Sequence, residues 1–86
     1  MAISNYIVTV TSGTAIAANT SRSTLVITNT GGNPVFININ DVAEINKGIY
    51  LSSNGGVWMM DRGLFTKGYI TAITSSGTSN LAIYEL

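Results

Sequence analysis

Four carboxylates are the side chains of this chain best suited to acid–base chemistry: Asp41, Glu44, Asp61 and Glu85. Two carboxylates placed on either side of a glycosidic bond can cleave it. Asp41 and Glu44, however, are three residues apart in a segment that resembles the cap of a short helical turn. Asp61 directly precedes Arg62, which indicates a turn or a surface ion pair, and Glu85 is one residue from the end. Structural roles therefore account for the first three, no pairing is evident for Glu85, and we predict no catalytic residue.

Histidine and cysteine are absent, which removes imidazole bases, His-containing triads and thiolate chemistry. The run from Asn38 to Glu44 contains oxygen ligands, but Ala43 stands where an EF-hand loop requires glycine. The glycine pairs at 31–32 and 55–56 are not followed by a lysine and a helix, so no phosphate-binding loop is predicted. We therefore predict no enzyme, no cofactor and no metal, with an irregular calcium site near Asn38 as the open alternative.

Aromatic side chains with amide neighbours form a second kind of candidate site, because such groups can line a carbohydrate-binding pocket. The candidates are Tyr50, Asn54, Trp58 and Tyr69. A lone tryptophan in an apolar strand is more typical of a core or an interface. Carbohydrate binding is therefore kept as the alternative function.

Apolar residues recur with a period of two, which is typical of half-buried strands. The segment 35–40, VFININ, shows this alternation most clearly. The expected strands cover residues 5–10, 23–29, 35–40, 49–51, 57–61, 69–74 and 81–85, and a weaker candidate covers 15–18.

Turn-forming clusters at residues 29–34, 52–56 and 75–80 separate these strands, and the Asn54-Gly55 pair is typical of tight hairpins. The segment that begins at Asp41 has room for one or two helical turns at most. We predict one all-β domain over residues 1–86, a small antiparallel sandwich or jelly-roll-like barrel of seven to eight short strands.

The composition points to contact with other proteins. Charged residues make up 9% of the chain, against roughly 25% in ordinary domains. The formal net charge is zero, so little repulsion keeps copies apart. Four scattered cations cannot form a nucleic-acid-binding stripe, and no apolar run approaches the roughly 20 residues of a membrane span. We therefore expect neither nucleic acid nor membrane as a partner. No secretory signal is visible, so we expect synthesis in a cytoplasm.

Two expected strands contain uninterrupted apolar runs, at residues 49–51 and 57–60, and such strands need cover on both faces. We predict that contact between copies provides this cover. The predicted interface residues are Tyr50, Trp58, Met59, Met60 and Phe65. The alternative is an overlying loop at residues 62–67, which contains Leu64 and Phe65.

Several segments resemble small bacteriophage virion proteins of the head decoration or cement type. The segments that carry the resemblance are residues 15–22 (AIAANTSR), 25–31 (LVITNTG), 35–37 (VFI), 68–73 (GYITAI), 76–77 (SG) and the last strand, which ends at Glu85. They cover most of the chain, and they are structural motifs without an active site. Many decoration proteins have a longer N-terminal arm, whereas strand character begins here by about Asn5.

The resemblance implies a jelly-roll-like sandwich that decorates or cements a phage capsid as a dimer or trimer. The implied partners are further copies of the chain and the major capsid protein, and the implied location is the virion, assembled in the host cytoplasm. Related sandwiches occur in head fibres and tail tips, so a phage adhesin or receptor-binding module that binds carbohydrate is the alternative. Arg22 is expected either to reach an acidic partner or to pack its stem against the domain with its guanidinium in water.

Overall fold

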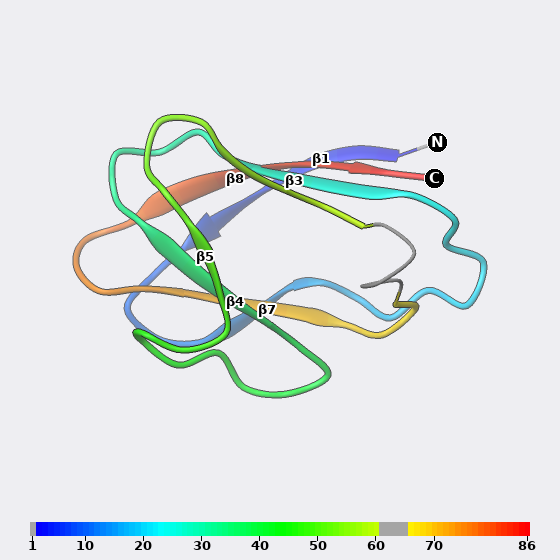
Figure 1. Cartoon of the computed structure of the whole chain (residues 1–86), viewed down its shortest axis with the longest axis horizontal. Coiled ribbons are helices and arrows are strands. Elements are labelled where there is room, and N and C mark those ends of the chain that lie inside the picture. Colours follow the sequence, from blue (N-terminus) through cyan, green and yellow to red (C-terminus); the bar gives the residue numbers. More distant parts are fainter. Residues whose placement is uncertain (1, 61–65) are drawn as a thin grey trace.

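The computed structural model describes residues 2–60 and 66–86, which form two four-stranded antiparallel sheets packed as a sandwich (Figure 1). The strands are β1 (Ala2–Val8), β2 (Gly13–Ile16), β3 (Leu25–Asn29), β4 (Val35–Ile39), β5 (Ile49–Leu51), β6 (Gly56–Met59), β7 (Ile70–Thr74) and β8 (Ser79–Glu85). The first sheet has the order β1-β8-β3-β6, and the second has the order β2-β7-β4-β5. The structure confirms the predicted all-β sandwich.

The strands pair in a nested order: β4 with β5, β3 with β6, β2 with β7 and β1 with β8. Consecutive strands therefore often lie in different sheets. The connections at residues 30–34, 52–55 and 75–78 each cross between the sheets, and they gather at one end of the sandwich (Figure 1). The chain termini lie side by side at the other end.

The crossing at residues 52–55 differs from the tight hairpin that the sequence predicts. Asn54 and Gly55 do form a tight turn, with φ angles of 58° and 125°. The turn does not close a hairpin, because β5 and β6 belong to different sheets. Asn54 N–H donates to the Gly31 carbonyl (2.9 Å), and Gly55 N–H donates to the Asn29 carbonyl (2.7 Å). These hydrogen bonds join the turn to the connection between β3 and β4, and the chain continues into the first sheet as β6.

The core lies between the two inner faces, where alternate side chains of both sheets meet. Its buried members are Val8, Ile16, Leu25, Ile27, Val35, Ile37, Leu51, Trp58, Met60, Ile70, Ala72, Leu81 and Ile83. Each fully buried aliphatic side chain contributes roughly 1.5–3 kcal/mol. At the edge of the sandwich, the ring of Tyr6 on β1 reaches Gly13 on β2, where a Cβ would overlap the Tyr6 hydroxyl.

The strand boundaries differ most at the N-terminus, where β1 covers residues 2–8 rather than 5–10. All seven residues pair with β8, and Val8 is fully buried, whereas Val10 lies beyond the strand and is 53% exposed. The segment after β4 forms turns rather than a helix, and Asn40 and Asn46 adopt the left-handed conformation that asparagine tolerates.

The segment 40–48 lies against the outer face of the second sheet (Figure 1). The Thr71 hydroxyl of β7 donates to the Asp41 carbonyl (2.6 Å), and Ala43 N–H donates to the Ser12 hydroxyl (2.9 Å). As a result Thr71, which points away from the core, is only 5% exposed. The outer face of the second sheet is therefore partly covered by the chain itself.

Asn29 is a buried amide that ties the crossings together. Its Nδ2 donates to the carbonyls of Asn33 (2.8 Å) and Leu51 (3.1 Å). Its Oδ1 accepts from Gly31 N–H (3.1 Å) and from the Ser79 hydroxyl (2.7 Å). Both donor hydrogens and the acceptor oxygen of this amide are therefore used.

Arg22 occupies the opposite end and contradicts both expectations for it, because the residue is 1% exposed. Its Nε donates to Glu85 Oε2 (2.7 Å), and its Nη2 donates to the Ala17 carbonyl (2.9 Å). Its Nη1 donates to the carbonyls of Thr66 (3.2 Å) and Gly68 (2.8 Å). The guanidinium therefore lies neither in water nor toward a partner but joins three segments of its own chain.

Candidate protein-contact surface

The outer face of the first sheet carries two rows of side chains that cross all four strands. In the first row the register aligns Ile3, Tyr84, Val26 and Met59. In the second row it aligns Asn5, Ala82, Thr28 and Val57. We call these eight residues the apolar face, because six of them are hydrophobic and none is charged.

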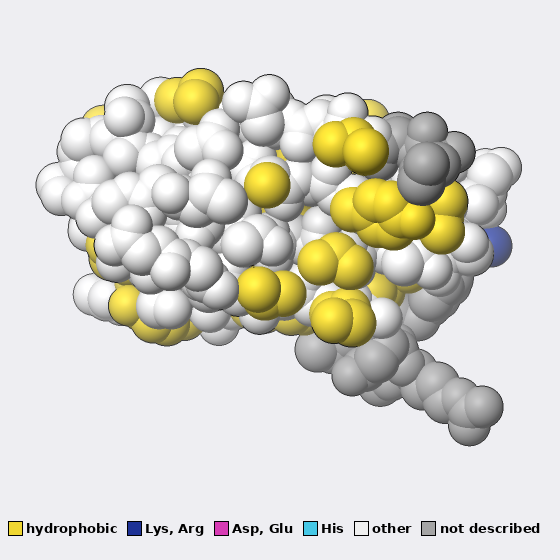
Figure 2. Space-filling view, turned by 90° about the horizontal axis from the view of Figure 1, so that it is seen from above, with side chains coloured by type: hydrophobic (Ala, Val, Ile, Leu, Met, Phe, Trp, Pro, Cys, Tyr) yellow, Lys and Arg dark blue, Asp and Glu magenta, His cyan; other side chains and the backbone are white. Residues whose placement is uncertain are grey.

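The apolar face is open to solvent. Ile3 is 78% exposed, Met59 is 59% exposed and Val57 is 53% exposed. Figure 2 shows hydrophobic side chains gathered over the half of this side of the molecule nearest the termini. The solvent side of an antiparallel sheet is ordinarily polar, and a contiguous exposed apolar patch indicates a contact site.

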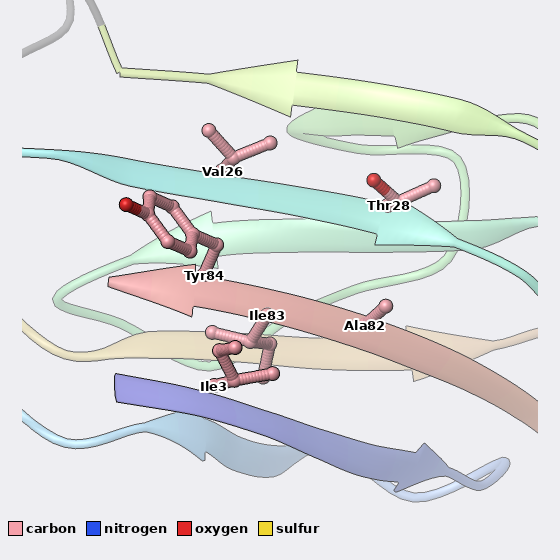
Figure 3. Close-up of a pocket in the computed structure, with 6 residues that line it drawn as sticks. All are labelled: Ile3, Val26, Thr28, Ala82, Ile83 and Tyr84. Atoms are coloured by element: carbon pink, nitrogen blue, oxygen red, sulfur yellow. The ribbon is translucent and has the colours of Figure 1, made fainter. Parts of the chain in front are cut away.

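A shallow groove of about 200 Å³ runs along the middle of this face (Figure 3). It is lined by Ile3, Val26, Thr28, Ala82, Ile83 and Tyr84. Ligand pockets usually measure about 300–1,000 Å³, so this groove is small for a metabolite. Its size and its uncharged lining suit an apolar side chain from another protein.

A line of hydrogen-bonded polar side chains borders the apolar face. Asn5 Nδ2 donates to Asn80 Oδ1 (3.0 Å), and Asn80 Nδ2 donates to the Thr30 hydroxyl (2.8 Å). An apolar centre with an uncharged polar border is typical of protein interfaces. The arrangement therefore favours binding to a protein surface over chemistry on a small molecule.

The predicted interface residues are distributed over different parts of the fold. Trp58 and Met60 belong to the core of their own chain and are 7% and 9% exposed. Met59 lies on the apolar face, whereas Tyr50 is 57% exposed on the other sheet. Phe65 lies outside the described residues, and so does most of the alternative covering loop at residues 62–67. The alternation along β6 explains the difference, because a strand with apolar residues on both sides still turns only every second side chain inward.

Each carboxylate in the described segments has a partner of its own. The Asp41 carboxylate accepts from Val42 N–H (2.7 Å), and Glu44 Oε1 lies 3.5 Å from Lys47 Nζ in an exposed pair. Glu85 is bound by Arg22. Within residues 2–60 and 66–86, no group of three potential metal-ligating side chains comes together.

The candidate carbohydrate-binding residues do not form one platform. Trp58 is buried, and Asn54 lies in the turn between β5 and β6. Tyr50 pairs with Phe36 of β4, and their ring centroids are 5.4 Å apart. The Tyr69 carbonyl accepts a hydrogen bond from Asn40 N–H. Asn40 is four residues beyond Phe36, and four residues of extended strand span about 13 Å, so Tyr69 is distant from the Tyr50–Phe36 pair. Tyr50 remains the most exposed aromatic platform among these candidates.

Sequence reasoning missed most of the apolar face. Ile3 precedes the first expected strand, residues 5–10, but belongs to β1. The alternation in residues 25–29 marks Val26 and Thr28 as one face, which is the available signal. The register that aligns Val26 with Tyr84 and Met59 depends on contacts between distant segments.

Comparisons with models of known protein families, with curated proteins and with solved structures found no match. Within the described part of the chain, no helix has the length and apolar character needed to cross a membrane.

Proposed function

We propose that this chain is a structural, non-enzymatic virion protein that decorates or cements a phage capsid through protein–protein contacts as a homo-oligomer. The observation that carries the proposal is the apolar face, an exposed uncharged surface that spans a whole sheet. Burying it against a shell protein requires no charged group to lose its water, which is the costly part of forming an interface.

Two further observations support the proposal. The nested strand pairing is the connectivity of a jelly roll, a fold that recurs in viral capsid domains and in lectin domains. This is an analogy at the level of the fold and does not by itself assign a function. The resemblance of several segments to phage decoration proteins points in the same direction.

The test begins with the genes beside the one for this chain, where the proposal expects a major head protein, and uses empty heads assembled from that protein. The purified protein is expected to co-sediment with these heads and to raise the temperature at which they open. Met59→Asp places a charge on the apolar face and is expected to weaken binding at least about tenfold, because a buried unpaired charge is strongly unfavourable. Ser76→Asp, in an exposed turn away from this face, is the matched control and should bind normally. Heads with the same heat resistance in the presence and absence of the protein would contradict the cementing role.

The alternative is a carbohydrate-binding module of a head fibre or tail tip. The exposed Tyr50 ring beside Phe36 is the observation that favours it. A glycan array would test this function, with Tyr50→Ala as the variant expected to lose any signal. An array without hits would leave the contact function as the better explanation.

A further inference from the structure

The outer edge of β1 is a row of backbone groups without a partner strand. β1 pairs with β8 on one side over residues 2–8, and it is the last strand of its sheet (Figure 3). Within the described segments, no backbone hydrogen bond joins its other side to the chain. Such an edge is a template for another extended strand.

The other three edges are shorter or interrupted. β2 has four residues and a shift of register, β5 has three residues, and β6 has four. β1 has seven residues in continuous register, and it contains no charge and no proline. Charges, prolines, bulges and short lengths are the features that keep sheet edges from pairing, and β1 has none of them.

The side chains of β1 are spaced symmetrically. Ile3 and Ile7 are 78% and 54% exposed, and each is two residues from Asn5, the middle residue of the strand. In an antiparallel pair of two β1 strands, all seven residues overlap only when Asn5 lies opposite Asn5. That register places Ile3 of each copy opposite Ile7 of the other, so the exposed isoleucines pack side by side across the pair.

We propose that two copies of this chain pair through their β1 edges, antiparallel and with Asn5 on the two-fold axis. The partner strand is β1 itself, because its spacing is self-complementary and it carries no charge to repel a second copy. The pairing joins the two first sheets into one eight-stranded sheet, whose outer surface carries two apolar faces. The inference rests on the proposed function and specifies the homo-oligomer that it requires.

The first test uses opposite charges at the axis. The wild-type protein is expected to sediment as a dimer at micromolar concentration. Asn5→Lys and Asn5→Glu should each weaken the dimer at least about tenfold, because like charges directly opposite each other repel. An equimolar mixture of the two variants should restore it. Val57→Lys, which adds the same charge at the far edge of the sheet, should leave the dimer intact.

The second test uses a neutral substitution, so β1 does not have to accommodate a charge. The chain contains no cysteine, so Asn5→Cys introduces a single thiol. Residues directly opposite in an antiparallel pair have Cα atoms about 4.5–5.5 Å apart, which is within disulfide range. Mild oxidation should therefore cross-link Asn5→Cys into a dimer and leave Val57→Cys monomeric.

A wild-type monomer, equal cross-linking of the two cysteine variants, or a mixture that does not restore the dimer would overturn the inference. These outcomes are separate from those of the head-binding test. A dimer that does not bind heads would contradict the capsid-binding function alone. A monomer that binds heads would contradict the edge pairing and the homo-oligomer, but not the attachment to the capsid.

Discussion

The two ends of the sandwich are each held by one buried polar side chain, but the chemistry differs. Beside the termini, the charged guanidinium of Arg22 binds the Glu85 carboxylate and three backbone carbonyls. At the crossing end, the neutral amide of Asn29 binds only uncharged groups. Each residue joins segments that are distant in the sequence. In this small domain without cysteine, a buried side chain with four hydrogen bonds joins distant segments at each end.

The difference also affects the surface. The Arg22 side chain is fully buried and that of Glu85 is 18% exposed, so these opposite charges largely neutralise each other inside the fold. The solvent-facing surface therefore carries even less charge than the composition indicates. Contact with another protein over such a surface would remove water from few charged groups.

Replacing Arg22 tests the charged end and should have the largest effect. Arg22→Met leaves Glu85 and three carbonyls without their donor. The expected loss is about 3–5 kcal/mol of unfolding free energy, as for other broken buried ion pairs. Urea denaturation followed by fluorescence measures it, because Trp58 is the single tryptophan and is buried.

The double variant Arg22→Met with Glu85→Met is the control for this prediction. Removing both charges avoids an unpaired carboxylate, so the double variant should be more stable than Arg22→Met alone. If the second substitution instead adds its own full loss of stability, the ion pair is not what makes this end sensitive.

Replacing Asn29 tests the neutral end. Asn29→Ala removes one hydrogen bond from each of four polar groups at the crossings. We expect a loss of about 2–3 kcal/mol, smaller than for Arg22 because no charge is left unpaired. Asn33→Ala, which removes an exposed hydrogen bond to the Thr78 carbonyl, is the comparison and should lose less than about 1 kcal/mol. Equal losses at the two positions would show that burial of the amide is unimportant.

Ser79→Ala is the mildest change at the same end. It removes the hydroxyl that donates to Asn29 Oδ1, while Gly31 N–H continues to donate to that oxygen. The expected loss is about 1 kcal/mol, measured by the same denaturation experiment. Ser76→Ala in an exposed turn should change stability by less than about 0.5 kcal/mol. A loss for Ser79→Ala as large as that for Asn29→Ala would assign the cross-link to the hydroxyl rather than to the amide.

The strands could be predicted because their signal is local. Alternation located β4 to within one residue, the uninterrupted apolar run 49–51 coincides with β5, and the turn clusters lie between the strands as expected. The pairing of strands could not be predicted in the same way. The Asn54-Gly55 pair predicts a hairpin, but its hydrogen bonds to Asn29 and Gly31 hold the turn where the chain crosses from one sheet to the other.

The candidate surface was only partly predictable. Met59 is one of the predicted interface residues, but Val26 and Tyr84, which the register aligns with it, lie more than 20 residues away in the sequence. Arg22 illustrates the same limit. Its burial depends on Glu85, 63 residues further along the chain, and on carbonyls that only the folded loops bring together.

The side-by-side course of β1 and the end of β8 has a practical consequence, since Ala2 lies opposite Glu85. A peptide or label fused near either terminus would emerge at the same end of the sandwich, next to the half of the surface where hydrophobic side chains gather. The turns at residues 30–34, 52–55 and 75–78 would then project on the opposite side. Those turns, rather than the termini, are the positions at which an inserted epitope would be displayed farthest from the proposed attachment surface.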